Sequence, residues 1–149
     1  MANTTKIKIV IEPYVRSWLS NQFTRHAFEK KHVRLASGGS HKFDAVAEDG
    51  SIVAAILCNR ARTRTQRENT GGVRKALTDL SYLQELSADV KKVMVFTDDS
   101  FCDLIRRRAS RLVTEPIQMM VCALPPRLET LLGEILDKAS HEQRAAGEH

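Results

Sequence analysis

The feature that most constrains the fold is an unbroken apolar run, IVAAILC, from Ile52 to Cys58. A run of this length without polar alternation is typical of a strand that is buried on both faces of a sheet. The segment before it, Phe43 to Ala47, alternates in character and carries one acid, Asp44. Turn residues, EDGS at positions 48–51, separate the two segments. The sequence therefore predicts a β-hairpin whose second arm lies at the centre of the sheet.

Helices and further strands are expected around this hairpin. The apolar spacing predicts helices from about Pro13 to Phe28, from Gly71 to Ser87, after Asp98 and after Pro126, and strands over His32 to Ala36, Val93 to Thr97 and Ile117 to Leu124. Lys6 to Ile11 is rich in β-branched residues and is either a short edge strand or the run into the first helix. The order is roughly αβββαβαβα. It predicts an α/β fold with a mixed central sheet and helices on both faces.

The length of the chain predicts a single domain, and the lack of a membrane span or secretory signal predicts a cytoplasmic location. We expect a single domain over residues 1–139 and a polar C-terminal tail over 140–149. No apolar run approaches the roughly 20 residues of a membrane span, and the N-terminal segment lacks the features of a secretory signal. The three cysteines, Cys58, Cys102 and Cys122, show no metal-binding spacing, so we expect reduced thiols in the core and no membrane partner.

Positive charge is concentrated in one segment. The chain has a net charge of +5, and the residues Arg60, Arg62, Arg64, Arg67, Arg74 and Lys75, opposed only by Glu68, account for all of it. Such a segment indicates a polyanion partner, DNA or RNA, and arginine suits the two-pronged recognition of phosphate. We expect Asn59, Arg60, Arg62, Arg64 and Arg67 to bind nucleic acid. The alternative is an ordinary solvated loop.

This order of elements, with an acid in the first hairpin arm, resembles the PD-(D/E)XK nuclease superfamily, whose fold is called restriction-endonuclease-like. More narrowly, it is similar to small stand-alone bacterial domains of that superfamily. The resemblance lies in a first helix such as EPYVRSWL (12–19), a glycine-rich approach to an aspartate in HKFDAV (41–46), an apolar strand and a long helix. It covers roughly Glu12 to Leu124.

The resemblance implies a metal site that this chain only partly retains. In such nucleases the hairpin aspartate and a glutamate of the apolar strand share Mg²⁺, and a lysine two residues further on faces the same way. Asp44 matches the aspartate, and Glu12 matches a glutamate of the first helix, with Glu29 a weaker candidate. The Glu-x-Lys positions fall on Ala55 and Leu57, whose side chains offer no ligand.

We therefore interpret Asp44 and Glu12 as remnant catalytic positions. The chain is expected to be a nuclease-like domain that has lost metal-dependent phosphodiester hydrolysis and acts as a nucleic-acid-binding or interaction module, with no cofactor and no metal. One alternative is an active Mg²⁺-dependent nuclease whose catalytic groups have migrated, for which Lys42, Glu48, Arg60, Glu68 and Lys91 are candidates. The other is a homodimeric scaffold without a nucleic-acid role. Asp44 also has a structural alternative, in which it bonds the Gly38–Gly39 loop.

Overall fold

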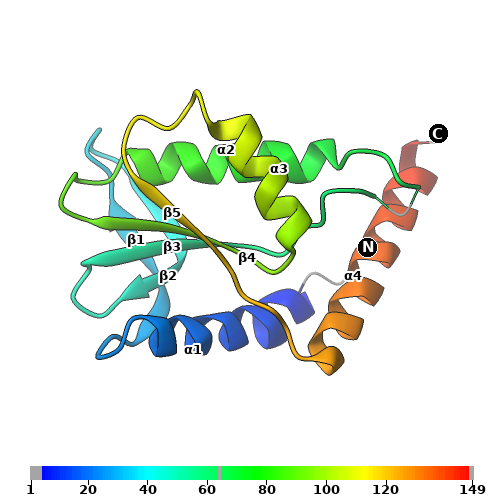
Figure 1. Ribbon diagram of the computed structural model, residues 1–149, viewed down its shortest axis with the longest axis horizontal. Coiled ribbons are helices and arrows are strands. Elements are labelled where there is room, and N and C mark those ends of the chain that lie inside the picture. Colours follow the sequence, from blue (N-terminus) through cyan, green and yellow to red (C-terminus); the bar gives the residue numbers. More distant parts are fainter. Residues whose placement is uncertain (1–4, 64, 148–149) are drawn as a thin grey trace.

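A five-stranded mixed sheet forms the centre of the protein, with helices on both of its faces (Figure 1). The computed structural model describes residues 5–63 and 65–147, with side chains up to residue 138. The strands follow one another across the sheet in chain order, β1-β2-β3-β4-β5. The α/β class, the mixed sheet and the order of elements are therefore confirmed.

The first three strands form an antiparallel meander, and the last two run parallel to the third. β1 (Phe28–Arg34), β2 (Ser40–Ala47) and β3 (Ile52–Leu57) pair antiparallel. β4 (Lys91–Phe96) and β5 (Ile117–Val121) join parallel to β3, and they are reached through α2 (Thr70–Gln84) and α3 (Asp99–Ala109). This arrangement follows from the connections, because a tight turn joins antiparallel strands and a helical crossover joins parallel ones.

β3 is the buried centre that its apolar run predicts. All six of its residues are buried. Val53, Ala55 and Leu57 face the core beneath α2 and α3, whereas Ile52, Ala54 and Ile56 face the core beneath α1 (Glu12–Gln22) and α4 (Pro126–Gly147). A polar residue on either face of β3 would therefore enter a packed layer.

The N-terminal segment is helical, so the edge-strand interpretation of Lys6 to Ile11 is wrong. A π-helical stretch, η1 (Ile7–Ile11), runs directly into α1. Its last residue, Ile11, is fully buried together with Val15 and Leu19, each one turn further on. This stripe against the sheet outweighs the weak β-preference of the segment.

Several element ends also differ from the expected ones. α1 ends at Gln22, not near Phe28, because Arg25 adopts a positive φ of 75° and the chain turns into β1. β1 consequently begins four residues before His32. α4 continues through the expected polar tail to Gly147. In the part of the chain that the structure describes, no helix has the length and apolar character needed to cross a membrane.

Candidate functional site

Asp44 lies where β2 separates from β3. The β1–β2 register shifts because β2 carries one extra residue between Phe43 and Val46, and the β2–β3 pairing ends at Ala45 opposite Ala54. Beyond that point the Asp44 Oδ2 accepts a hydrogen bond of 2.9 Å from the Ile56 N–H. A side chain thus replaces the missing backbone acceptor of the ladder. Asp44 has a structural partner, but this partner is β3 and not the Gly38–Gly39 loop.

Glu12 is a buried carboxylate at the start of α1. The residue is 8% exposed, and its Oε1 has no hydrogen-bond partner in the part of the chain that the structure describes. Two cations lie near that oxygen, the Arg16 Nη1 at 3.7 Å and the Lys30 Nζ at 3.8 Å. Arg16 also donates to the Asp44 carbonyl at 3.0 Å, which joins α1 to the bulge. Burial raises the pKa of Glu12, and the negative charge of Asp44 raises it further. The two sequence-predicted remnant positions therefore lie close enough to repel each other, whereas Glu29 is exposed on β1.

The burial of Glu12 predicts a pH-dependent effect of Glu12→Gln. Since the pKa of Glu12 is higher in the folded protein than in the unfolded chain, folding takes up a proton and stability falls as pH rises above the ordinary carboxyl range. We expect Glu12→Gln to match the wild type near pH 4 and to become more stable than it as pH approaches 7. Urea unfolding at both pH values measures this. Glu29→Gln, at an exposed carboxylate, is the matched control, and a Glu12→Gln difference that is independent of pH would contradict the expectation.

Two further charged groups, neither of them among the predicted site residues, reach the same region from α2. The Lys75 Nζ contacts the Asp79 Oδ2 at 3.0 Å. Burial raises the pKa of Asp79, while Lys75 opposes that rise. Partial burial works to lower the pKa of Lys75, whose side chain stays 55% exposed, but the charges of Asp79 and then Asp44 outweigh it and the pKa is raised. The available signal was an i, i+4 acid–base pair on a helix that directly follows the apolar strand.

Of the residues that we considered as migrated catalytic groups, four have other partners and the fifth, Lys42, is exposed. Lys42 is exposed on β2, Glu48 accepts from the Ala27 N–H, Arg60 pairs with Glu129, Glu68 pairs with Arg108, and Lys91 lies over the Phe23 ring. Around Glu12 and Asp44 the fold therefore places Arg16 and Lys30, and α2 adds Lys75 and Asp79.

The cysteines are free and buried, as expected. Cys58 lies at the end of β3, where burial, reinforced by the charges of Glu12 and Asp44, raises its pKa to about 12. A thiol with this pKa stays protonated near neutral pH and is a poor nucleophile. Cys58 is therefore a core residue.

Among the described residues, one group of three metal-ligand side chains converges within 4.8 Å, namely His26, Glu48 and Asp49. These residues lie at the turns beside β1 and β2. Both acids are used by the turns: Glu48 accepts from the Ala27 N–H at 2.8 Å and Asp49 accepts from the Ser51 N–H at 3.0 Å. These hydrogen bonds within the turns explain why the three side chains lie close together.

The basic loop, residues 59–69, contains some residues that stabilise the fold and others that face solvent. Asn69 caps α2 through a 3.0 Å bond from the Gly72 N–H, and Asn59 packs against that same turn. The Arg60 guanidinium turns toward α4, where its Nη2 contacts the Glu129 Oε1 at 2.8 Å. Arg62 and Arg67 are exposed, with the Arg62 Nη1 donating to the Gln66 carbonyl at 2.9 Å; Arg64 lies outside the described residues.

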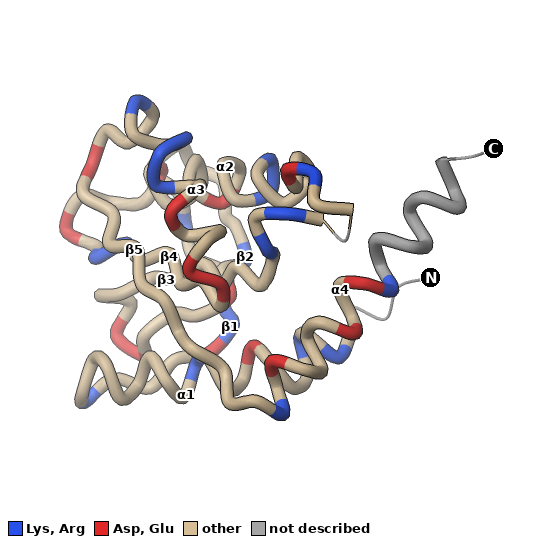
Figure 2. The backbone as a smooth tube through the Cα atoms, turned by 45° about the vertical axis from the view of Figure 1, so that its right-hand side comes forward, with Lys and Arg blue, Asp and Glu red and all other residues tan. Residues whose placement is uncertain are grey.

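Arginines of α3 join the exposed arginines of the loop. One groove is lined by Ala61, Arg62, Glu68, Ser100, Leu104, Arg107 and Arg108. A second groove, between α2 and α3, includes Arg74 and shares Glu68 and Arg108 with the first. We call Arg62, Arg74, Arg107 and Arg108 the arginine surface; Figure 2 shows the α3 arginines in blue. Among the described residues, Glu68, which pairs with Arg108, is the only acid in either groove lining.

Comparisons with protein-family models, with curated proteins and with solved structures find no match for this chain.

Proposed function

We propose that this chain is a restriction-endonuclease-like domain that binds DNA or RNA through the arginine surface and has lost metal-dependent hydrolysis. The observation that carries this proposal is the convergence of Arg62, Arg107 and Arg108, from two separate segments, on one groove with a single acid. Guanidinium groups bind phosphate oxygens in pairs and attract a polyanion from a distance. The free, buried cysteines and the absence of ligands on β3 support a cytoplasmic binding module.

A titration with labelled single- and double-stranded DNA and RNA tests this function. Each phosphate neutralised on duplex DNA contributes about −0.9 to the slope of log affinity against log salt. Three such contacts predict a loss of roughly 40-fold between about 50 and 200 mM salt. Binding that is absent, or that does not respond to salt, would leave the arginine surface as a solvated face and favour a scaffold.

Metal-dependent hydrolysis is a second candidate, and the buried, unbonded Oε1 of Glu12 favours it. Glu12 and Asp44 are hard oxygen donors that would contribute ligands to Mg²⁺, whose charge would relieve the repulsion between them. Among the described residues no third acid completes a cluster with these two carboxylates within 4.8 Å, so water and substrate phosphate would have to complete the coordination. Bound there, Mg²⁺ would polarise a phosphoryl oxygen. Lys75, from α2, would stabilise negative charge in place of the missing strand lysine.

The titration with and without Mg²⁺ and Mn²⁺ separates the two candidates, and we expect binding without cleavage. If cleavage occurs, Asp44→Asn and Lys75→Met should both abolish it, whereas Lys42→Met should not. Asparagine is preferable to alanine at position 44 because its oxygen can still accept from the Ile56 N–H. Cleavage that survives Asp44→Asn would exclude this site as its source.

A further inference from the structure

β5 is the last strand of the sheet, and its outer edge is unpaired among the described residues. In a parallel ladder, alternate residues direct both backbone groups to the same neighbour. The Cys122 N–H bonds to the Phe96 carbonyl on β4 at 2.8 Å, so the even-numbered residues of this segment face β4. The N–H and C=O groups of Ile117, Met119 and Val121 therefore point away from the sheet.

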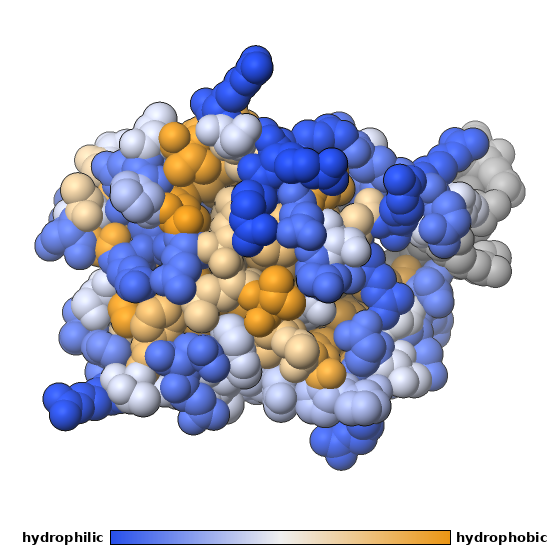
Figure 3. Space-filling model, in the orientation of Figure 1, coloured by the Kyte–Doolittle hydropathy of each residue, from blue (hydrophilic) through white to orange (hydrophobic). Residues whose placement is uncertain are grey.

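This edge strand carries no charged side chain, the device that protects the opposite edge of the sheet. The sequence of β5, IQMMV, contains no charge, whereas the opposite edge strand β1, FEKKHVR, is mostly charged. Val121 is 39% exposed. Figure 3 shows an apolar band in orange and tan where Figure 1, in the same orientation, places β5. An uncharged, open strand edge of this kind is a site for pairing with another strand.

We propose that the edge pairs with β5 of a second copy of this chain, antiparallel and across a two-fold axis at Met119. In this register Met119 lies opposite Met119, and Ile117 lies opposite Val121. Because the outward-facing residues are spaced evenly about Met119, every free N–H and C=O of the three residues in both copies gains a partner. Pairing of β5 with β1 would bring charged residues against an apolar strand and would propagate without closing, whereas the two-fold arrangement closes.

The charges on α3 also suit a second copy. The groove residues Ser100, Leu104, Arg107 and Arg108 face the basic loop, and Arg108 also faces α2. The helical period places the exposed residues Asp99, Asp103 and Arg106 on the other side of α3, toward the β5 edge. The two-fold axis sets the α3 helices of the two copies antiparallel on one face of the sheet. Arg106 pairs with Asp103 of its own helix at 3.0 Å, and in the dimer it would also face Asp99 and Asp103 of the other copy. The surfaces are therefore complementary in charge, and the groove arginines stay apart.

Light scattering after size exclusion and sedimentation velocity, at about 1–100 μM protein, test the proposal. We expect a dimer whose dissociation constant rises at least tenfold in Gln118→Lys/Val121→Lys. Neither of these side chains belongs to the core clusters, so circular dichroism should be unchanged. Gln118→Thr/Val121→Thr is the uncharged control and should remain dimeric. A wild type that is monomeric at 100 μM, or a lysine variant that dimerises like the wild type, would overturn the proposal.

A charge swap on α3 tests the two-fold arrangement at exposed positions. Arg106→Asp should weaken the dimer about tenfold, and Arg106→Asp/Asp103→Arg should restore it. No effect of Arg106→Asp would show that α3 lies outside the interface. Neither experiment involves nucleic acid, so the dimer and the proposed function can fail independently.

Discussion

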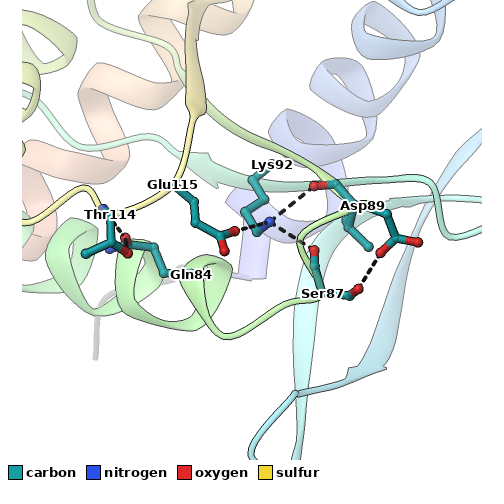
Figure 4. Close-up of polar contacts among 7 residues, drawn as sticks. Gln84, Ser87, Asp89, Lys92, Thr114 and Glu115 are labelled. Carbon is teal, nitrogen blue, oxygen red and sulfur yellow. Dashed lines mark hydrogen bonds and ion pairs between the residues drawn. The ribbon is translucent and has the colours of Figure 1, made fainter.

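Lys92→Met is expected to lower the free energy of unfolding by about 3 kcal/mol, because it removes the ammonium from a buried polar network. The Lys92 side chain is 2% exposed, and its Nζ donates to the Ser87 carbonyl at 3.0 Å, the Val90 carbonyl at 3.3 Å and the Glu115 Oε2 at 2.8 Å (Figure 4). All three ammonium protons are therefore used. Lys92 ties together the loop that enters β4 and the loop that enters β5.

Methionine keeps the length of the stem but leaves these acceptors without their donor. At about 2–4 °C per kcal/mol for a chain of this size, the midpoint of thermal unfolding should fall by about 6–12 °C. Lys91→Met is the matched control, since Lys91 is exposed and its Nζ lies over the Phe23 ring, 5.2 Å from the centroid. A cation over a ring at an exposed site contributes only about 0.5–1 kcal/mol. Lys92→Met/Glu115→Leu should recover part of the loss, because it removes the unpaired carboxylate as well. Equal midpoints for Lys92→Met and Lys91→Met would show that the network contributes little.

The central position of β3 in the sheet was predictable because its sequence is compatible with only one environment. A strand with apolar residues on both faces must lie between two layers, and the order of its neighbours then determines which strands are parallel. The end of α1 was not predictable in the same way. No glycine or proline marks it, and the turn depends on Arg25 adopting a conformation that few arginines adopt.

The candidate site was predictable only in part, since it depends on contacts between distant segments. Asp44 and Glu12 follow from the resemblance, but the role of Asp44 as an acceptor for Ile56 depends on a bulge that leaves no residue signature. Lys75 was assigned to the basic segment by charge alone, yet its side chain pairs with Asp79. In the same way, the α3 arginines follow the pattern of a solvated helix face, and only the fold brings them to the loop.

The last prediction concerns the arginine surface. Arg62→Gln/Arg107→Gln is expected to weaken nucleic-acid binding by about 100-fold at low salt, if each guanidinium makes one charge-assisted hydrogen bond worth about 1.5 kcal/mol or more. The salt slope on duplex DNA should become shallower by about 2, one step for each phosphate that is no longer neutralised. Both side chains line the same groove, but they come from the loop and from α3. A large combined effect would therefore show that the two segments act on one ligand.

Lys31→Gln/Arg34→Gln is the matched control. It removes the same charge from exposed positions on β1, the strand at the opposite edge of the sheet from α3 and β5. If binding depends only on the net charge of the chain, the two double variants should weaken it equally, and the arginine surface would then have no special role. Arg62→Lys/Arg107→Lys separates charge from geometry. Because lysine keeps the charge but not the planar fork, this variant should preserve the salt slope and still lose affinity if the arginines bind phosphate with two hydrogen bonds each.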